Sequence, residues 1–210
     1  MKTKVYKELN LKDLNEIEKM IKEGSVIAFP TETVYGLGCD IYNKEATDEI
    51  FKLKKRDRSK ALIVHISNIS QAEKIANLKD DFYILANHFF PGPLTLIVEK
   101  KDNVDILSNN NTIAIRMPNN NKTLSFIEKT GPIFGTSANI SNNKSPIKID
   151  EVLRDFNNKL SVIIDDGICK DKKPSTILDI TKEPYRILRK GSVLKEDMES
   201  IIKKTINEVN

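Results

Sequence analysis

Three segments of the sequence place small polar or charged side chains directly beside short apolar runs. They are residues 30–38, 54–65 and 135–141. Such runs are typical of buried strands, and an open α/β sheet presents its ligand site where its strands end. We therefore expect the three segments to meet at one site that works by hydrogen bonding and charge stabilisation.

The first segment, PTETVYGLG, offers two threonine hydroxyls and a carboxylate after a predicted strand at 25–29. Gly36 and Gly38 would let the backbone approach a ligand closely. A tight turn without a ligand is the alternative interpretation. The segment is not a dinucleotide-binding fingerprint, because Cys39, Asp40 and Ile41 follow and the third glycine is missing.

The second segment concentrates positive charge. Residues 52–60 hold six basic side chains against Asp57 and carry a net charge of +5, whereas the whole chain carries +4. Lys54, Arg56, Arg58 and Lys60 lead into the predicted strand at 61–66. Guanidinium and ammonium groups in this place suit phosphate or carboxylate oxygens. The alternative is a solvated helix end that is stabilised by the helix dipole.

The third segment, GTSANIS, resembles half of a hydrolase nucleophile elbow, but Asn139 stands where the closing glycine should be. The only possible histidine bases are His65 and His88, and a lone strand histidine such as His65 more often packs than binds. The hydroxyls and amide therefore favour a cradle for an anion or a sugar over a serine hydrolase. The chain also lacks a Walker P-loop, so bound ATP would depend on side-chain cations.

Apolar spacing, with Asn10 as a cap and Gly24 as a stop for the first helix, predicts a mixed α/β fold. Helices are expected at 11–23, 44–54, 70–77, 80–89, 122–129 and 148–156, with a last one from about residue 195. Strands are expected at 25–29, 61–66, 94–99, 112–117, 132–135, 161–165, 175–180 and 185–189. No linker interrupts this pattern, so we predict one domain over residues 1–210 and no second domain.

Composition favours a cytoplasmic protein without a membrane partner. No apolar run approaches the roughly 20 residues that span a bilayer, and the N-terminus lacks the apolar middle region of a signal peptide. Two cysteines, Cys39 and Cys169, are too few for a disulfide framework or a zinc cluster, so we expect buried thiols in a reducing compartment.

Seven blocks together resemble the YrdC-like threonylcarbamoyl-AMP synthase family, in that family's order. They are PTETVYGLG, KKRDRSKALIVHI, FPGPLTLIV, TIAIRMP, GTSANIS, STILDI and ILRKGSV, which span residues 30–193. The resemblance implies a twisted mixed sheet with flanking helices and a basic concave groove. It also implies a nucleotidyltransferase that converts L-threonine, bicarbonate and ATP into threonylcarbamoyl-AMP and pyrophosphate. The downstream partners would be tRNA, modified at an adenosine beside the anticodon, and the transferase complex that modifies it.

The resemblance also assigns roles to individual residues. The expected L-threonine contacts are Thr33, His65, Arg116, Thr136 and Ser175. The expected ATP contacts are Arg56, Lys60, Thr112, Ser137, Asn139, Ser145 and Arg189. The catalytic group would consist of Lys54, Arg56, Ser137 and Asn139, and Tyr35 would line the same pocket. Mg²⁺ would arrive with the triphosphate and be held by phosphate oxygens, without a ligand from the protein.

Two residues depart from the family's pattern, since Asp57 and Ala61 stand where prolines are common. They predict a more flexible loop with a negative charge near the polyphosphate.

Two other functions fit parts of the sequence. A basic protein that binds RNA in tRNA or ribosome maturation, without catalysis, would use the same cations for backbone phosphates. Carbamoyl transfer, as in related domains of hydrogenase-maturation proteins, is disfavoured by the small size and the lack of paired cysteines.

Overall fold

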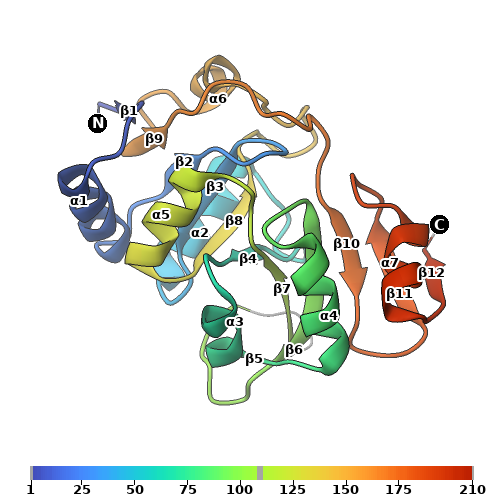
Figure 1. The fold of residues 1–210 in the computed structure, drawn as a ribbon. Helices are drawn as coiled ribbons and strands as arrows, with labels where there is room; N and C mark the ends of the chain where they lie inside the picture. The colour runs from blue at the N-terminus through green and yellow to red at the C-terminus, as the bar shows by residue number, and fades with distance from the viewer. Residues whose placement is uncertain (1, 108–110, 210) are drawn as a thin grey trace.

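Helices and strands alternate along the chain in a computed structural model that describes residues 2–107 and 111–209 (Figure 1). The helices are α1 (Leu11–Lys22), α2 (Lys44–Lys54), α3 (Ile69–Ile75), α4 (Asp80–Phe89), α5 (Asn121–Thr130), α6 (Ile149–Phe156) and α7 (Lys195–Ile202). The strands are β1 (Lys4–Tyr6), β2 (Ile27–Phe29), β3 (Gly36–Asp40), β4 (Ile63–His65), β5 (Ala76–Asn77), β6 (Leu94–Lys100), β7 (Thr112–Arg116), β8 (Ile133–Ser137), β9 (Val162–Ile164), β10 (Thr176–Asp179), β11 (Tyr185–Arg189) and β12 (Ile206–Glu208).

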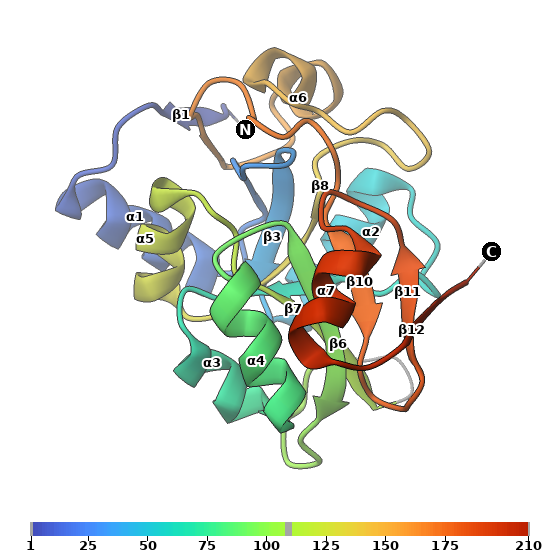
Figure 2. The same cartoon turned by 45° about the vertical axis from the view of Figure 1, so that its right-hand side comes forward.

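All these strands join one twisted mixed sheet, as the family resemblance implied. Its order is β1-β9-β2-β3-β8-β4-β7-β6-β10-β11-β12, and β5 pairs with β6. The sheet contains parallel pairs such as β4 with β7 and antiparallel pairs such as β3 with β8. Figures 1 and 2 show α1 beside α5 towards the N-terminal end of this order and α7 beside α4 towards the other end.

Local signals account for the helix boundaries. Asn10 accepts a hydrogen bond from the backbone N–H of Asp13, and Asp13 accepts one from that of Asn10, so α1 begins with a capping box. Gly24, with φ of 93°, follows its last turn, as the sequence predicted. Asn43 caps α2 by accepting a hydrogen bond from the backbone N–H of Ala46, and the prediction of 44–54 for this helix is confirmed.

Four short strands were not predicted, namely β1, β3, β5 and β12. Residues 76–77, predicted as the end of a helix, form β5 instead and pair with β6. The sequence GLGCD of β3 contains no β-branched residue, yet all five residues are buried between β2 and β8. Burial between neighbouring strands is a tertiary effect that overrides local propensity.

Two apolar clusters cover the sheet. The smaller one packs α1 and α5 against β2, β8 and β9, and the larger one includes side chains of the other five helices. Cys39 and Cys169 are both buried and free, as predicted. Among the described residues, no helix is long and apolar enough to cross a membrane.

Candidate active site

Nine of the predicted site residues line one cavity of about 150 Å³. They are Thr33, Arg56, His65, Arg116, Thr136, Ser137, Ser145, Ser175 and Arg189. They come from the loop after β2, the loop after α2, the strands β4, β7, β8 and β11, and the segments before α6 and β10. A cavity of this size is smaller than the roughly 300–1,000 Å³ of sites for drug-sized ligands.

The pairing register brings residues from distant segments to one face of the sheet. Ile63 lies opposite Gly135, and His65 lies opposite Arg116. Residues two apart in a strand point to the same face, so Ser137 shares that face with Gly135. The cavity therefore lies against a face of the sheet. Four of its lining residues are also the last residues of β4, β7, β8 and β11, so the site lies where strands end, as we expected.

Glycines on this face make room for two aromatic rings. A Cβ atom at Gly135 would lie 2.5 Å from the His65 ring, and one at Gly36 would lie 2.6 Å from the Phe29 ring. The two rings meet edge to face with their centroids 5.3 Å apart. We expected Gly36 and Gly38 to admit a ligand. Both instead make room for Phe29, although Gly36 also lines the cavity.

His65 both packs in the core and lines the cavity. Burial, and secondly the positive charge of Arg116, lower the pKa of His65 to about 3. The imidazole is therefore neutral near pH 7, and it can donate or accept a hydrogen bond without adding charge to the site.

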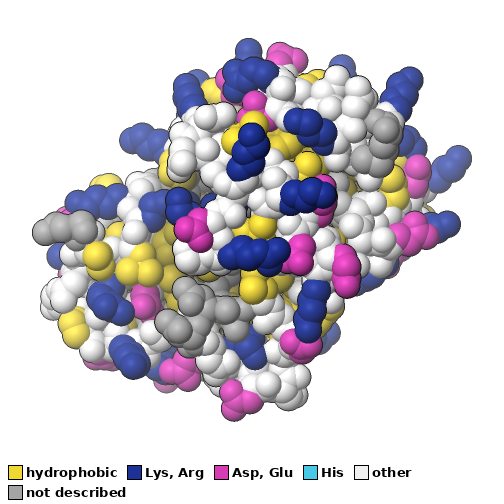
Figure 3. Space-filling view, turned by 180° about the vertical axis from the view of Figure 1, so that it is seen from behind, with side chains coloured by type: hydrophobic (Ala, Val, Ile, Leu, Met, Phe, Trp, Pro, Cys, Tyr) yellow, Lys and Arg dark blue, Asp and Glu magenta, His cyan; other side chains and the backbone are white. Residues whose placement is uncertain are grey.

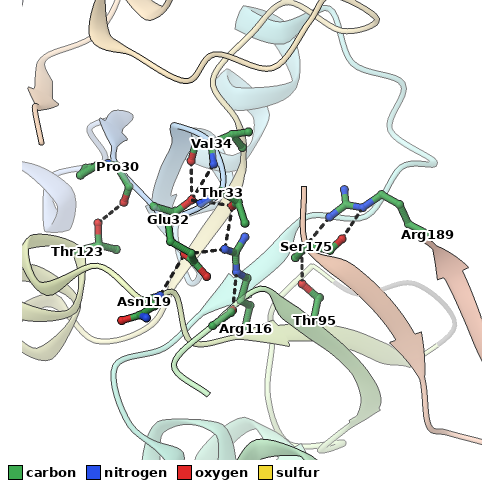
Figure 4. A network of polar contacts seen from close by, with 12 residues as sticks. Pro30, Glu32, Thr33, Val34, Thr95, Arg116, Asn119, Thr123, Ser175 and Arg189 are labelled. Carbon is green, nitrogen blue, oxygen red and sulfur yellow. Dashed lines mark hydrogen bonds and ion pairs between the residues drawn. The ribbon is translucent and has the colours of Figure 1, made fainter. Parts of the chain in front are cut away.

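Arg116 is the most constrained cation of the cavity (Figure 4). Its Nη2 lies 2.9 Å from Glu32 Oε2 and 2.9 Å from Thr33 Oγ1, and its Nε donates to the carbonyl oxygen of Gly92 at 3.2 Å. Thr33 Oγ1 in turn lies 2.8 Å from Thr31 Oγ1. The PTET segment thus holds the guanidinium from one side.

Arg189 and Ser175 form a second group at the opposite wall of the cavity (Figure 4). Arg189 donates to the carbonyl oxygen of Ser175 at 3.0 Å and to its Oγ at 2.9 Å, and Ser175 Oγ lies 2.8 Å from Thr95 Oγ1. Burial, and then the charges of Arg116 and Arg56, lower the pKa of Arg189 to about 10.

Arg56 is the third arginine of the cavity. It donates to the carbonyl oxygens of Lys60 at 3.2 Å and Ala61 at 2.9 Å, and burial lowers its pKa. Three guanidinium groups that meet in one small cavity repel one another, so an anion there would be strongly favoured.

Four predicted site residues do not line this cavity, namely Lys54, Lys60, Thr112 and Asn139. Lys54 is buried, and its Nζ donates to the carbonyl oxygens of Ser137 and, at 2.6 Å, Asn139. Burial lowers the pKa of Lys54 to about 7. Asn139 donates to the carbonyl oxygens of Ile140 and Asn143, both at 2.8 Å. In this arrangement both side chains shape the loop after β8.

Lys60 is exposed on the loop before β4. Thr112 lines a smaller neighbouring cavity with Arg58, which pairs with Asp48 at 2.7 Å. Tyr35 was expected to line the main cavity, and this is wrong. Its side chain is fully buried, and its hydroxyl donates to Asp165 Oδ1 and the carbonyl oxygen of Gly167, both at 2.9 Å.

Sequence reasoning assigned no role to three residues that hold the cavity's side chains. Glu32 pairs with Arg116, Thr31 bonds to Thr33, and Thr95 bonds to Ser175. Glu32 and Thr31 belong to the polar PTET segment, which was their only signal. Thr95 lies inside a predicted strand and is recognisable only from its tertiary contact.

The outer surface carries charges of both signs (Figure 3). Figure 3 shows lysine and arginine side chains spread across the rear face with acidic side chains between them. Among residues 2–107 and 111–209, no group of three or more histidine, cysteine, aspartate or glutamate side chains has the arrangement of a metal site.

Comparison with known proteins places this architecture in a family. The family model Sua5/YciO/YrdC, described as telomere recombination, matches residues 19–191. A threonylcarbamoyl-AMP synthase of Pyrococcus abyssi is 40% identical over 87% of this chain and 55% of its own length. The corresponding Bacillus subtilis protein is 36% identical over 96% of this chain and 62% of its own length. A putative threonylcarbamoyl-AMP synthase of Methanocaldococcus jannaschii is 32% identical over 92% of this chain and 95% of its own length.

Solved structures show the same relationship. A crystal structure of P. abyssi Sua5 complexed with L-threonine is 36% identical, with a TM-score of 0.91 over 99% of this chain and 62% of that one. E. coli YciO, at 21% identity, shares the fold with a TM-score of 0.84 over 93% of this chain and 99% of that one. The chain thus spans 55% to 62% of the length of the P. abyssi and B. subtilis relatives. It belongs to the Sua5/YciO/YrdC family.

Proposed function

We propose that this protein is a nucleotidyltransferase that converts L-threonine, bicarbonate and ATP into threonylcarbamoyl-AMP and pyrophosphate. The observation that carries the proposal is the convergence of Arg56, Arg116 and Arg189 with several hydroxyl groups in one cavity. Relatives named threonylcarbamoyl-AMP synthase, and the complex of P. abyssi Sua5 with L-threonine, support the choice of substrates.

L-Threonine fits the enclosed part of the site. Arg116 is the cation for the carboxylate, because its guanidinium is held in place and lines the cavity. Thr33 and Ser175 offer hydroxyl groups on opposite sides of the cavity. The cavity of about 150 Å³ accommodates an amino acid, whereas a nucleotide must extend beyond it.

ATP would bind across the mouth of the cavity, with its phosphates between Arg56 and Arg189. Arg56 is half-buried and Arg189 is more exposed, yet partial loss of solvent lowers the pKa of both, and it also strengthens their attraction to a phosphate. Ser137 and Ser145 line the same region and can donate hydrogen bonds to phosphate oxygens. Mg²⁺ would enter as part of the ATP substrate, held by phosphate oxygens and water.

The reaction requires positioning more than a protein nucleophile. The amine nitrogen of threonine bonds to the carbon of CO₂ and loses a proton, or it bonds to the carbon of bicarbonate and a water molecule leaves, and either route gives a carbamate. A carbamate oxygen then attacks the α-phosphorus of ATP, and the bond to pyrophosphate breaks. Fixed guanidinium groups stabilise the charge that develops on the phosphoryl oxygens. Neutral His65 lies beside Arg116 and can bond to threonine.

The product would serve tRNA modification in the cytoplasm. Threonylcarbamoyl-AMP is an activated acyl phosphate that must pass to a transferase complex, which would place the threonylcarbamoyl group on an adenosine beside the anticodon.

Pyrophosphate release tests the proposal directly. Purified protein is incubated with ATP and Mg²⁺, with L-threonine and bicarbonate omitted one at a time, and the adenylate is sought by mass spectrometry. We expect release only when both are present, together with the mass of threonylcarbamoyl-AMP. ATP that stays intact in a folded sample would contradict the proposal.

A further inference from the structure

Glu32 is a buried carboxylate that contacts Arg116 from behind the proposed threonine site, because it lines a neighbouring cavity with Asn119 and not the threonine cavity itself. Its side chain is 6% exposed and that of Arg116 is 5% exposed, and their Oε2 and Nη2 atoms lie 2.9 Å apart. The same Oε2 accepts a hydrogen bond from the backbone N–H of Asn119 at 3.1 Å (Figure 4). Glu32 therefore joins the loop after β2 to Arg116 at the end of β7 and to the segment that follows it.

The hydrogen bonds of Arg116 explain what this contact does. Three of its five N–H groups point at the carbonyl oxygen of Gly92, at Glu32 and at Thr33 Oγ1. No partner of Nη1 occurs in the described part of the chain, and Arg116 lines the cavity. The two N–H groups of Nη1 are thus left for a ligand.

The carboxylate of Glu32 is not fully hydrogen-bonded in this arrangement. Its Oε1 is buried and has no hydrogen-bond partner in the described residues. An unpaired oxygen on a buried carboxylate costs stability, and such groups are found where function requires them. Glu32 is also the carboxylate that offsets the charge of Arg116, which lies close enough to Arg189 and His65 to lower the pKa of both.

We propose that Glu32 is a positioning residue that fixes Arg116 so that its Nη1 side binds the carboxylate of the amino-acid substrate. This role rests on the proposed function, since it takes L-threonine as the substrate. Glu32 does not touch the substrate in this arrangement. It sets the orientation of the guanidinium and keeps the cavity from accumulating uncompensated positive charge.

Substitution of Glu32 separates positioning from catalysis. Glu32→Gln keeps the shape and one acceptor oxygen but removes the charge. We expect the KM for L-threonine to rise at least tenfold, while kcat and the KM for ATP change less than threefold. Isothermal titration calorimetry should show the same tenfold loss of L-threonine affinity without ATP.

Two further variants exclude a general loss of stability. Asp81 is a comparable buried carboxylate that pairs with Lys204 at 2.6 Å, and it does not line the cavity. Asp81→Asn should lower the melting temperature and leave the KM for L-threonine unchanged. In an Arg116→Lys background, Glu32→Gln should raise that KM less than twofold further, because it acts through Arg116.

The outcomes distinguish this role from the proposed function. Wild-type protein that binds L-threonine but releases no pyrophosphate contradicts the synthase reaction alone, and calorimetry still tests Glu32. Equal L-threonine affinity in wild type and Glu32→Gln overturns the positioning role, as do additive effects of the Glu32 and Arg116 substitutions. Wild-type protein that binds no L-threonine overturns both.

Discussion

Arg56 and Arg58 are two residues apart in the sequence, but their side chains lie in different surroundings. Arg56 lines the main cavity, whereas Arg58 lies outside it, is exposed and pairs with Asp48. Arg56→Ala removes a half-buried cation from the place where phosphoryl charge would develop. We predict that kcat/KM for pyrophosphate release falls by about 10²–10³.

Arg58→Ala is the matched control, since it removes the same type of side chain from the same loop. Its kcat/KM should stay within about threefold of wild type because exposed ion pairs contribute little. If the two variants lose activity equally, the assignment of the phosphate site to the main cavity is wrong.

Lys54 gives a prediction about stability and pH. Its pKa is about 7 in the folded protein, against an ordinary value of 10.5. Between these values the unfolded chain binds the extra proton, so stability rises with pH and is lost as pH falls towards 7. Between about pH 8 and about pH 10, the free energy of unfolding of wild type should rise by about 1 kcal/mol per pH unit relative to that of a Lys54→Met variant.

Urea denaturation of both proteins across this range measures the difference. Because every other ionisable group is shared, a constant difference in the free energy of unfolding would show that Lys54 keeps its ordinary pKa. The carbonyl oxygens of Ser137 and Asn139 would then be stabilising a charged ammonium.

Residue types predicted much of the site but not its contacts. Polar segments in family order pointed to Thr33, Arg116 and Ser175, which the structure brings to one cavity. The sequence could not show that Tyr35 points away into the loop after β9, because Asp165 is 130 residues distant. Nor could it show that Glu32 pairs with Arg116, since that contact depends on how β2 and β7 are placed in the sheet.

At the scale of elements, helices were predictable because their signals are local. Asn10 and Asn43 cap α1 and α2 within three residues of the groups that they bind. The strand β3 was not predictable, because its glycines are explained by contacts with the neighbouring strands, namely the ring of Phe29 in β2 and the carbonyl oxygen of Phe134 in β8. The pairing register, which determines which side chains line the cavity, likewise depends on two strands at once.

Substitution of Gly135 in β8 tests the close contact of this strand with His65 in β4. A Cβ atom there would lie 2.5 Å from the His65 ring, so Gly135→Ala must displace the ring or the strand. We predict a loss of about 1–3 kcal/mol in the free energy of unfolding, measured by urea denaturation.

The double variant Gly135→Ala/His65→Ala provides the control. Removing the ring removes the clash, so Gly135→Ala should cost less in the His65→Ala background than in wild type. An equal cost in both backgrounds would mean that the backbone, and not the His65 ring, resists the methyl group.

At the scale of the whole molecule, the site depends on most of the sheet. Thr33 and Arg189 lie at opposite walls of the cavity. Thr33 belongs to the loop after β2 and Arg189 to β11, and these strands are separated by β3, β8, β4, β7, β6 and β10. L-Threonine should therefore bind the folded chain and have little affinity for the unfolded one. Binding of this kind stabilises the fold by mass action.

Thermal unfolding measures that stabilisation. L-Threonine at about 100 times its Kd should stabilise the protein by about 2.7 kcal/mol and raise Tm by roughly 5–10 °C for a chain of this length. Glycine, which has a carboxylate but neither hydroxyl nor methyl, should give a smaller shift at the same concentration. Arg116→Lys should reduce the shift for both ligands, because it removes the planar guanidinium that binds their common carboxylate. If saturating L-threonine leaves Tm unchanged while Mg·ATP raises it, the arginines serve the nucleotide alone, and the amino-acid site must lie elsewhere.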